Sequence, residues 1–70
     1  MIRLNDKAYH HRPGLMLRDL AESHFTEIPE VVFDLFVIVA NGAALSSAQA
    51  EERVLQDGDV LYIVPKVDGG

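Results

Sequence analysis

The sequence predicts an α+β fold in which one main helix packs on one face of a mixed sheet of four to five strands. Residues 1–5 alternate apolar and polar side chains, and a polar turn and a second extended segment follow, as in a β-hairpin. Residues 17–25 repeat apolar side chains at helical spacing, and residues 60–64 form a short apolar run after a glycine turn. With 70 residues and no cysteine, the chain is expected to form one domain without disulfides or a thiolate metal site.

The N-terminal hairpin is expected to consist of two short strands. In residues 1–5 the alternation turns Ile2 and Leu4 toward the core, and residues 8–12 form the return strand after a polar turn. Pro13-Gly14 then breaks the extended chain, because proline cannot donate to a strand ladder and glycine adopts turn conformations. The hairpin therefore ends before the helix begins.

The main helix is predicted over residues 17–25, for about two to three turns. Its polar side chains lie opposite an inner face formed by positions i, i+3, i+4, i+7 and i+8. That inner face comprises Leu17, Leu20, Ala21, His24 and Phe25. Residues 26–30 contain a proline and are expected to form a loop that leads to the second half of the sheet.

The middle of the chain is expected to add a strand, a hairpin and a short helical turn. Residues 34–40 are apolar on both faces, and Asn41-Gly42 is a strong hairpin signal because both residues tolerate positive φ. Residues 43–45 are expected to pair briefly with the preceding strand. Residues 46–52 form a short helical turn, and residues 53–55 form a short edge strand.

The final strand is predicted over residues 60–64, which are β-branched or aromatic and apolar on both faces. Asp57-Gly58 before it is a tight-turn signal, because glycine accepts the positive φ that such turns require. Pro65 has no N–H to donate to a neighbouring strand, so we expect the strand to end there.

A flexible C-terminal tail is expected after the domain. We assign residues 1–66 to the domain and residues 67–70 to the tail, which ends in Gly69-Gly70. Glycine has no Cβ, so such a tail can enter a narrow channel that excludes side chains. It would present the terminal carboxylate of Gly70, which is ionised at neutral pH.

The two apolar strands predict an exposed apolar face, because a helix can cover only one side of the sheet. Alternation places under the helix Phe36, Ile38, Ala40, Leu61 and Ile63. It places on the opposite face Leu35, Val37, Val39, Val60, Tyr62 and Val64. Contiguous exposed apolar area usually marks an interface. We therefore expect a partner protein to bind Val60, Tyr62, Val64, Pro65 and Val67.

Composition and spacing argue against several classes of function. Eleven acidic against six basic residues give a net charge of −5, which disfavours nucleic acid and favours a partner with a basic surface. No apolar run or signal-peptide pattern indicates a membrane, so a cytoplasmic protein is expected. No metal site is expected. His10 and His11 point to opposite sides of a strand, and Asp57 and Asp59 lack the further ligands of a calcium loop.

The chain resembles the small, ubiquitin-like sulfur-carrier proteins of the ThiS/MoaD type. The resemblance rests on three segments that stand in the order and at the spacing of that family. They are Val39-Ala40-Asn41-Gly42, Leu55-Gln56-Asp57-Gly58-Asp59 and Pro65-Lys66-Val67-Asp68-Gly69-Gly70. Residues 26–33 and 46–53 depart from the family pattern, and the second of these lacks the Pro-Arg and Trp of many thiamine-pathway members. The resemblance implies the β-grasp fold, which is also the arrangement that the predicted element order suggests.

The resemblance also implies a function, in which the chain is a carrier and not an enzyme. An adenylyltransferase related to the ubiquitin-activating enzymes would adenylate Gly70 with ATP, while Gly69 lets the tail enter its active site. A sulfur donor would then convert the terminus to a thiocarboxylate. The carrier itself would bind no cofactor. It would give the sulfur to thiazole synthase for thiamine, or to the large subunit of molybdopterin synthase.

Two other functions are compatible with the same residues. One is a β-grasp module that binds partners without covalent chemistry, in which Gly69-Gly70 has no role. The other is a ubiquitin-like modifier whose terminus forms isopeptide bonds. Both share the predicted fold with the sulfur carrier, and they differ from it in the fate of the terminal carboxylate.

Overall fold

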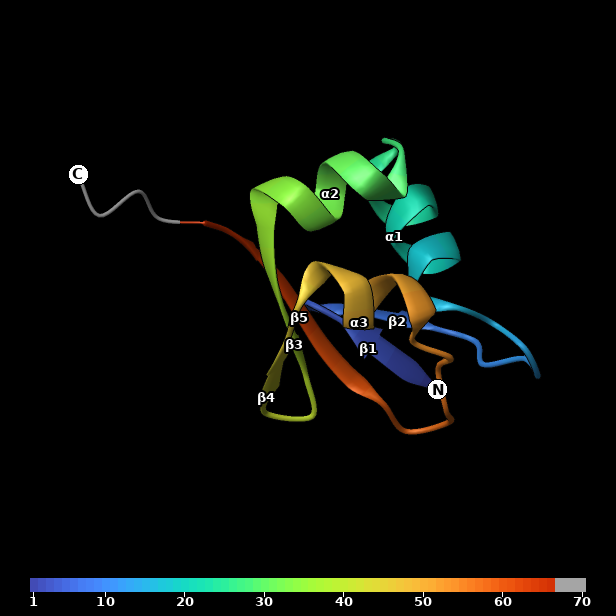
Figure 1. Cartoon of the computed structure of the whole chain (residues 1–70). Coiled ribbons are helices and arrows are strands. Elements are labelled where there is room, and N and C mark those ends of the chain that lie inside the picture. The colour runs from blue at the N-terminus through green and yellow to red at the C-terminus, as the bar shows by residue number, and fades with distance from the viewer. Residues whose placement is uncertain (67–70) are drawn as a thin grey trace.

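A computed structural model describes residues 1–66, so the predicted tail at 67–70, including Val67, Gly69 and Gly70, lies outside the described residues. The order of the elements is β1 (Ile2–Leu4), β2 (Lys7–Tyr9), α1 (Leu17–Phe25), α2 (Pro29–Leu35), β3 (Phe36–Ala40), β4 (Ala43–Leu45), α3 (Ser47–Glu52) and β5 (Val60–Pro65). The helices gather on one side of the sheet, and its other side is left without a helix (Figure 1).

The sheet has the strand order β2-β1-β5-β3-β4. The chain's last strand therefore lies in the middle, between β1 and β3 (Figure 1). β1 and β5 run parallel, whereas the β1–β2, β3–β5 and β3–β4 pairs are antiparallel. A mixed five-stranded sheet with helices on one side is the ubiquitin-like β-grasp arrangement. The predicted α+β fold class is confirmed.

The core lies between the helices and the helix-facing side of the sheet. Its largest fully buried side chains are Phe33, Ile2, Leu4, Leu17, Ile38, Leu55, Leu61, Ile63 and Val32. Three residues of the predicted inner helix face, Leu17, Leu20 and Ala21, are buried as expected. The other two, His24 and Phe25, are partly exposed at the end of α1, where Phe25 packs against the core.

The segment predicted as a loop and the start of a strand was wrongly assigned, because it contains a second helix, α2. Thr26 adopts a left-handed conformation with φ of 52° and ends α1. Pro29 then occupies the first turn of α2, where its missing N–H costs no hydrogen bond. Val32 and Phe33 bury their side chains from this helix, so tertiary packing favours it. β3 consequently begins at Phe36 and not at Asp34.

Other boundaries also differ from the predictions. β2 ends at Tyr9, whereas the return strand was predicted to continue to residue 12, next to Pro13-Gly14. Residues 53–55, predicted as a short edge strand, do not form one of the strands of the sheet. Val54 makes only an isolated bridge to Met16, although Leu55 N–H donates to Leu15 C=O at 2.8 Å and Leu55 is buried. α3 is longer than one turn, because the side chains and backbone of Ser46 and Gln49 form a capping box.

The final strand ends at Pro65, as predicted. Pro65 itself belongs to β5, as its last residue, and pairs with Phe36. The side of β5 toward which a Pro65 N–H would point is the β1 side, where β1 has already ended at Leu4. Proline is tolerated at such a position because no ladder hydrogen bond is lost.

Candidate carrier terminus and open sheet face

The exposed side of β5 and β3 forms a continuous apolar surface, which we call the open face. It consists of Val37, Val39, Val60, Tyr62 and Val64. The strand register places Val64 opposite Val37 and Tyr62 opposite Val39. Tyr62 is 49% exposed and Val64 is 44% exposed, whereas Val39 and Val60 are partly buried. The predicted division of the two strand faces is confirmed for these residues.

The opposite side of the same strands belongs to the core. Ile38, Ala40, Leu61 and Ile63 are all buried, as predicted. Phe36 was expected under the helix but is only partly buried, because it lies at the end of β3, where it packs against Phe25 with ring centroids 5.0 Å apart. Leu35 was expected on the outer face of the strand, but it is the last residue of α2; it is 57% exposed.

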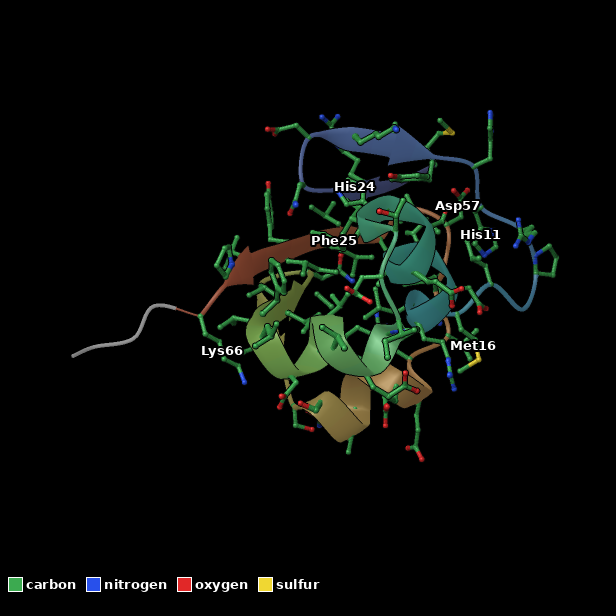
Figure 2. The ribbon with its side chains drawn as sticks, turned by 90° about the horizontal axis from the view of Figure 1, so that it is seen from above. His11, Met16, His24, Phe25, Asp57 and Lys66 are labelled. Atoms are coloured by element: carbon green, nitrogen blue, oxygen red, sulfur yellow. The ribbon has the colours of Figure 1, made fainter. Side chains whose placement is uncertain are left out.

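β5 remains paired up to the last described residue. Pro65 pairs with Phe36, and the Lys66 N–H donates to the Leu35 carbonyl at 3.1 Å. Figure 2 shows Lys66 beside the end of α2. The base of the tail is therefore held by backbone hydrogen bonding, and the point from which residues 67–70 start is fixed by the fold.

At its other end, β5 is fixed by a partly buried network around Asn41 and Asp59. Asn41 has a left-handed φ of 51°, its N–H donates to Val60 C=O at 2.8 Å, and its Oδ1 accepts from Val60 N–H at 2.9 Å. Its Nδ2 donates to Asp59 Oδ1 at 3.0 Å. The other oxygen of Asp59 accepts from the Gln56 N–H at 2.9 Å and from the Arg53 guanidinium at 3.4 Å.

This network determines the ionisation of Asp59. Burial raises the pKa of the Asp59 carboxyl, but the hydrogen bonds from Asn41 and Gln56 and the charge of Arg53 outweigh it. The pKa of Asp59 is therefore lowered from its ordinary value of 3.8. Asp59 is ionised at neutral pH, and through Asn41 it joins the turn before β5 to the turn after β3.

Asn5 provides a third connection to β5, which was not predicted from the sequence. It follows β1 with a left-handed φ of 55°, and its N–H donates to Leu61 C=O at 2.9 Å. Its side-chain amide forms the hydrogen bonds that the backbone of a neighbouring strand would form. The Oδ1 atom accepts from Ile63 N–H at 2.9 Å, and Nδ2 donates to Ile63 C=O at 3.3 Å. The available signal was an asparagine in a turn, since asparagine tolerates left-handed backbone.

Other histidine and aspartate side chains contact neighbouring residues of the same chain. His11 Nε2 lies 3.2 Å from Leu55 C=O, and the Tyr9 hydroxyl is hydrogen-bonded to His24 Nδ1. The Met1 ammonium pairs with Asp57 and lowers the pKa of that carboxyl, first by a hydrogen bond and then by its charge. Figure 2 shows His11 and Asp57 at the end of the molecule away from Lys66. Among residues 1–66 no three His, Cys, Asp or Glu side chains are grouped to hold a metal ion.

Nothing in the described part of the chain resembles a membrane-spanning helix, because none of its helices is both long and apolar enough.

β5 carries the open face, and Gly69-Gly70 follow it in the sequence. Comparison with known protein families gives the class of this protein. Residues 2–70 match the ThiS family, so the chain belongs to the ThiS family. No curated protein matches the chain.

Membership establishes the general role of the chain. It is a sulfur carrier, and the members of its family are small carriers and not enzymes. The role involves a partner that activates the carrier or transfers its sulfur. The match extends through Gly70, the residue on which sulfur chemistry was predicted from the sequence.

Proposed function

We propose that the chain carries sulfur as a thiocarboxylate on Gly70. The observation that carries this proposal is the family match over residues 2–70, which continues through the terminal Gly69-Gly70. It is supported by the backbone pairing of Lys66 with Leu35, because a fixed starting point limits how far the Gly70 carboxylate can reach from the docked body. Four residues beyond Lys66 can span at most about 14 Å.

The proposed reaction begins with adenylation. One oxygen of the Gly70 carboxylate attacks the α-phosphorus of ATP and expels pyrophosphate, which gives an acyl-adenylate. A sulfur nucleophile such as hydrosulfide then attacks the acyl carbon and expels AMP. The product is a thiocarboxylate, in which one carboxylate oxygen has been replaced by sulfur. The partner enzyme supplies the ATP site, and this chain supplies the carboxylate and the surface that docks it.

The proposed docking surface is the open face together with the base of the tail. The contacting residues are Val60, Tyr62, Val64, Pro65 and Val67, and Gly69 allows the tail to enter the active site. Tyr62 and Val64 are the most exposed of the described members and offer apolar area that a partner can bury. An adenylyltransferase related to the ubiquitin-activating enzymes and a sulfur acceptor would use this surface in turn.

The proposed acceptors are thiazole synthase in thiamine synthesis and the large subunit of molybdopterin synthase. Both pathways consume a terminal thiocarboxylate, and the proposal places these steps in the cytoplasm. The two are distinguished by mixing the thiocarboxylate form with each acceptor and measuring which one returns the carrier to its carboxylate form.

Intact-protein mass spectrometry tests the proposal. The full chain is incubated with a candidate activating enzyme, ATP and sulfide, and is expected to gain the mass difference between one sulfur and one oxygen. A chain lacking Gly70 moves its carboxylate back by one residue, about 3.3–3.6 Å, and should not react. A chain with alanine added after Gly70 should not react either, because a side chain then enters a channel suited to glycine.

Three outcomes would contradict the proposal. Equal conversion of the extended chain would show that Gly70 is not where the chemistry occurs. If the native chain never gains sulfur with any candidate activating enzyme but still binds one of them, a non-covalent binding module is the better description. Formation of isopeptide-linked products in place of the thiocarboxylate would indicate a ubiquitin-like modifier.

A further inference from the structure

A groove lies between α2 and α3, on the helix side of the molecule. Its volume is about 410 Å³, and it is lined by Glu30, Val31, Phe33, Asp34, Ser47 and Glu51. The two helices lie next to each other in both views (Figure 1 and Figure 2). All six lining residues belong to these two helices. We call this feature the α2–α3 groove.

The walls of the groove are fixed to each other. The Ser47 hydroxyl donates to the Phe33 carbonyl at 3.0 Å, which joins the beginning of α3 to the body of α2. Phe33 and Ala50 bury their side chains in the common core from the two helices. A groove with walls fixed in this way needs little reorganisation to accept a partner, so less binding free energy is lost in ordering it.

The lining combines apolar side chains with negative charge. Val31 is partly exposed, and carboxylates come from Glu30 and Asp34 on α2 and from Glu51 on α3. Arg18 lies 3.5 Å from Glu30, but both side chains are exposed, and such a pair contributes little. Residues 17–52 hold seven of the eleven acidic residues and one basic residue, Arg18, so the potential around the groove is negative.

We propose that the α2–α3 groove binds an arginine-bearing segment of a partner protein. An arginine side chain fits both parts of the lining, because its aliphatic stem covers apolar surface while its planar guanidinium pairs with carboxylates on two sides. This inference goes beyond the proposed function, since the groove is on the helix side and the open face is on the other side of the sheet. One partner can therefore occupy the groove while another holds the open face.

The test is an NMR titration of the full chain with a blocked pentapeptide in which two arginines are separated by leucine and alanine. Saturable amide shifts are expected in α2 and α3, and small shifts in β5. Asp34→Asn together with Glu51→Gln should weaken binding about fivefold, because each exposed charge pair contributes modestly. The matched control is Glu22→Gln with Glu52→Gln, which removes the same charge outside the groove lining and should change the affinity less than twofold.

A second variant keeps the proposal testable if the paired substitution disturbs the fold. Val31→Lys places a cation in the groove and should abolish the saturable shifts while the rest of the spectrum stays folded. Equal weakening in the control pair would overturn the proposal, because binding would then follow net charge alone. Shifts centred on the open face would also overturn it. So would self-association of the chain that competes with the peptide, since the occupant would then be a second copy.

Discussion

The two faces of β5 carry similar apolar side chains but differ in their surroundings. Leu61 and Ile63 are 0% and 2% exposed, whereas Tyr62 and Val64 on the same strand are 49% and 44% exposed. Hydrophobicity alone does not distinguish them. The difference arises because the helices gather on one side of the sheet, and successive strand residues point to opposite sides (Figure 1).

The comparison separates residues that stabilise the fold from residues that are available to a partner. Burial of the inner side chains removes apolar surface from water and stabilises the folded state by roughly 1.5–3 kcal/mol for each large side chain. The outer side chains gain little from folding. Their presence on the sheet is explained if a partner buries them, so substitutions on the two faces should affect different measurements.

The largest loss of stability is expected for Leu61→Ala. Removing a fully buried leucine leaves a cavity in a close-packed core, and we expect the free energy of unfolding to fall by about 2–5 kcal/mol in urea titrations. Val64→Ala is the matched control on the other face of the strand and should cost less than about 1 kcal/mol. If Leu61→Ala does not fold, Ile63→Val should still cost about 0.5–1.5 kcal/mol. Equal costs on both faces would contradict the comparison.

A smaller loss is expected for Gly58→Val in the turn before β5. Gly58 has φ of +91°, which confirms the positive φ predicted from the sequence. Apart from Gly58 itself and its two chain neighbours, no residue comes within 4 Å of an added Cβ, so the cost comes from backbone strain and not from a clash. Thermal and urea unfolding should show a loss of about 1–3 kcal/mol, and less for Gly58→Ala because alanine is not β-branched. Unfolding that does not differ from that of the native chain would mean that the turn relaxes without strain.

A still smaller and pH-dependent effect is expected for Asp59→Asn. At about pH 6 the native chain should be more stable by about 1 kcal/mol, because charge-assisted hydrogen bonds exceed neutral ones by that amount. The pKa of Asp59 is lowered in the folded state, so its contribution is present above the ordinary pKa and is lost as pH falls through the folded pKa.

The difference in unfolding free energy between the native chain and Asp59→Asn should therefore shrink as the pH falls below 3.8. Asp57 also has a lowered pKa, but it is present in both chains, and its effect cancels in this difference. A difference that stays constant down to low pH would show that the charge of Asp59 has no part in the network.

Much of this arrangement could be predicted from local sequence, and the exceptions have physical causes. Alternation in residues 36–40 and 60–64 sufficed to assign the two faces, because strand side chains have a period of two. α2 was missed because Pro29 suggests a loop, although it also fits a helix start, and the burial of Val32 and Phe33 depends on the assembled core. The Asn5 contacts to Ile63 were missed because they join residues 58 positions apart.

For the site, local sequence predicted the outer side chains of β5. The roles proposed for Gly69 and Gly70 follow from the family resemblance and not from local patterns. The pairing of Lys66 with Leu35, which fixes where the tail begins, could not be predicted, because it depends on the end of α2 and thus on a helix that the sequence did not reveal.

The most direct test of the division between the two faces is the steady-state kinetics of thiocarboxylate formation by the Tyr62→Asp chain. An aspartate on the open face should leave the free energy of unfolding within about 0.5 kcal/mol of the native value, because Tyr62 is half exposed. Burying an unpaired carboxylate against the activating enzyme should raise KM at least about tenfold while kcat is retained. Tyr62→Phe, which keeps the ring, should behave like the native chain. A lower kcat with an unchanged KM, or loss of the folded NMR spectrum, would contradict the account.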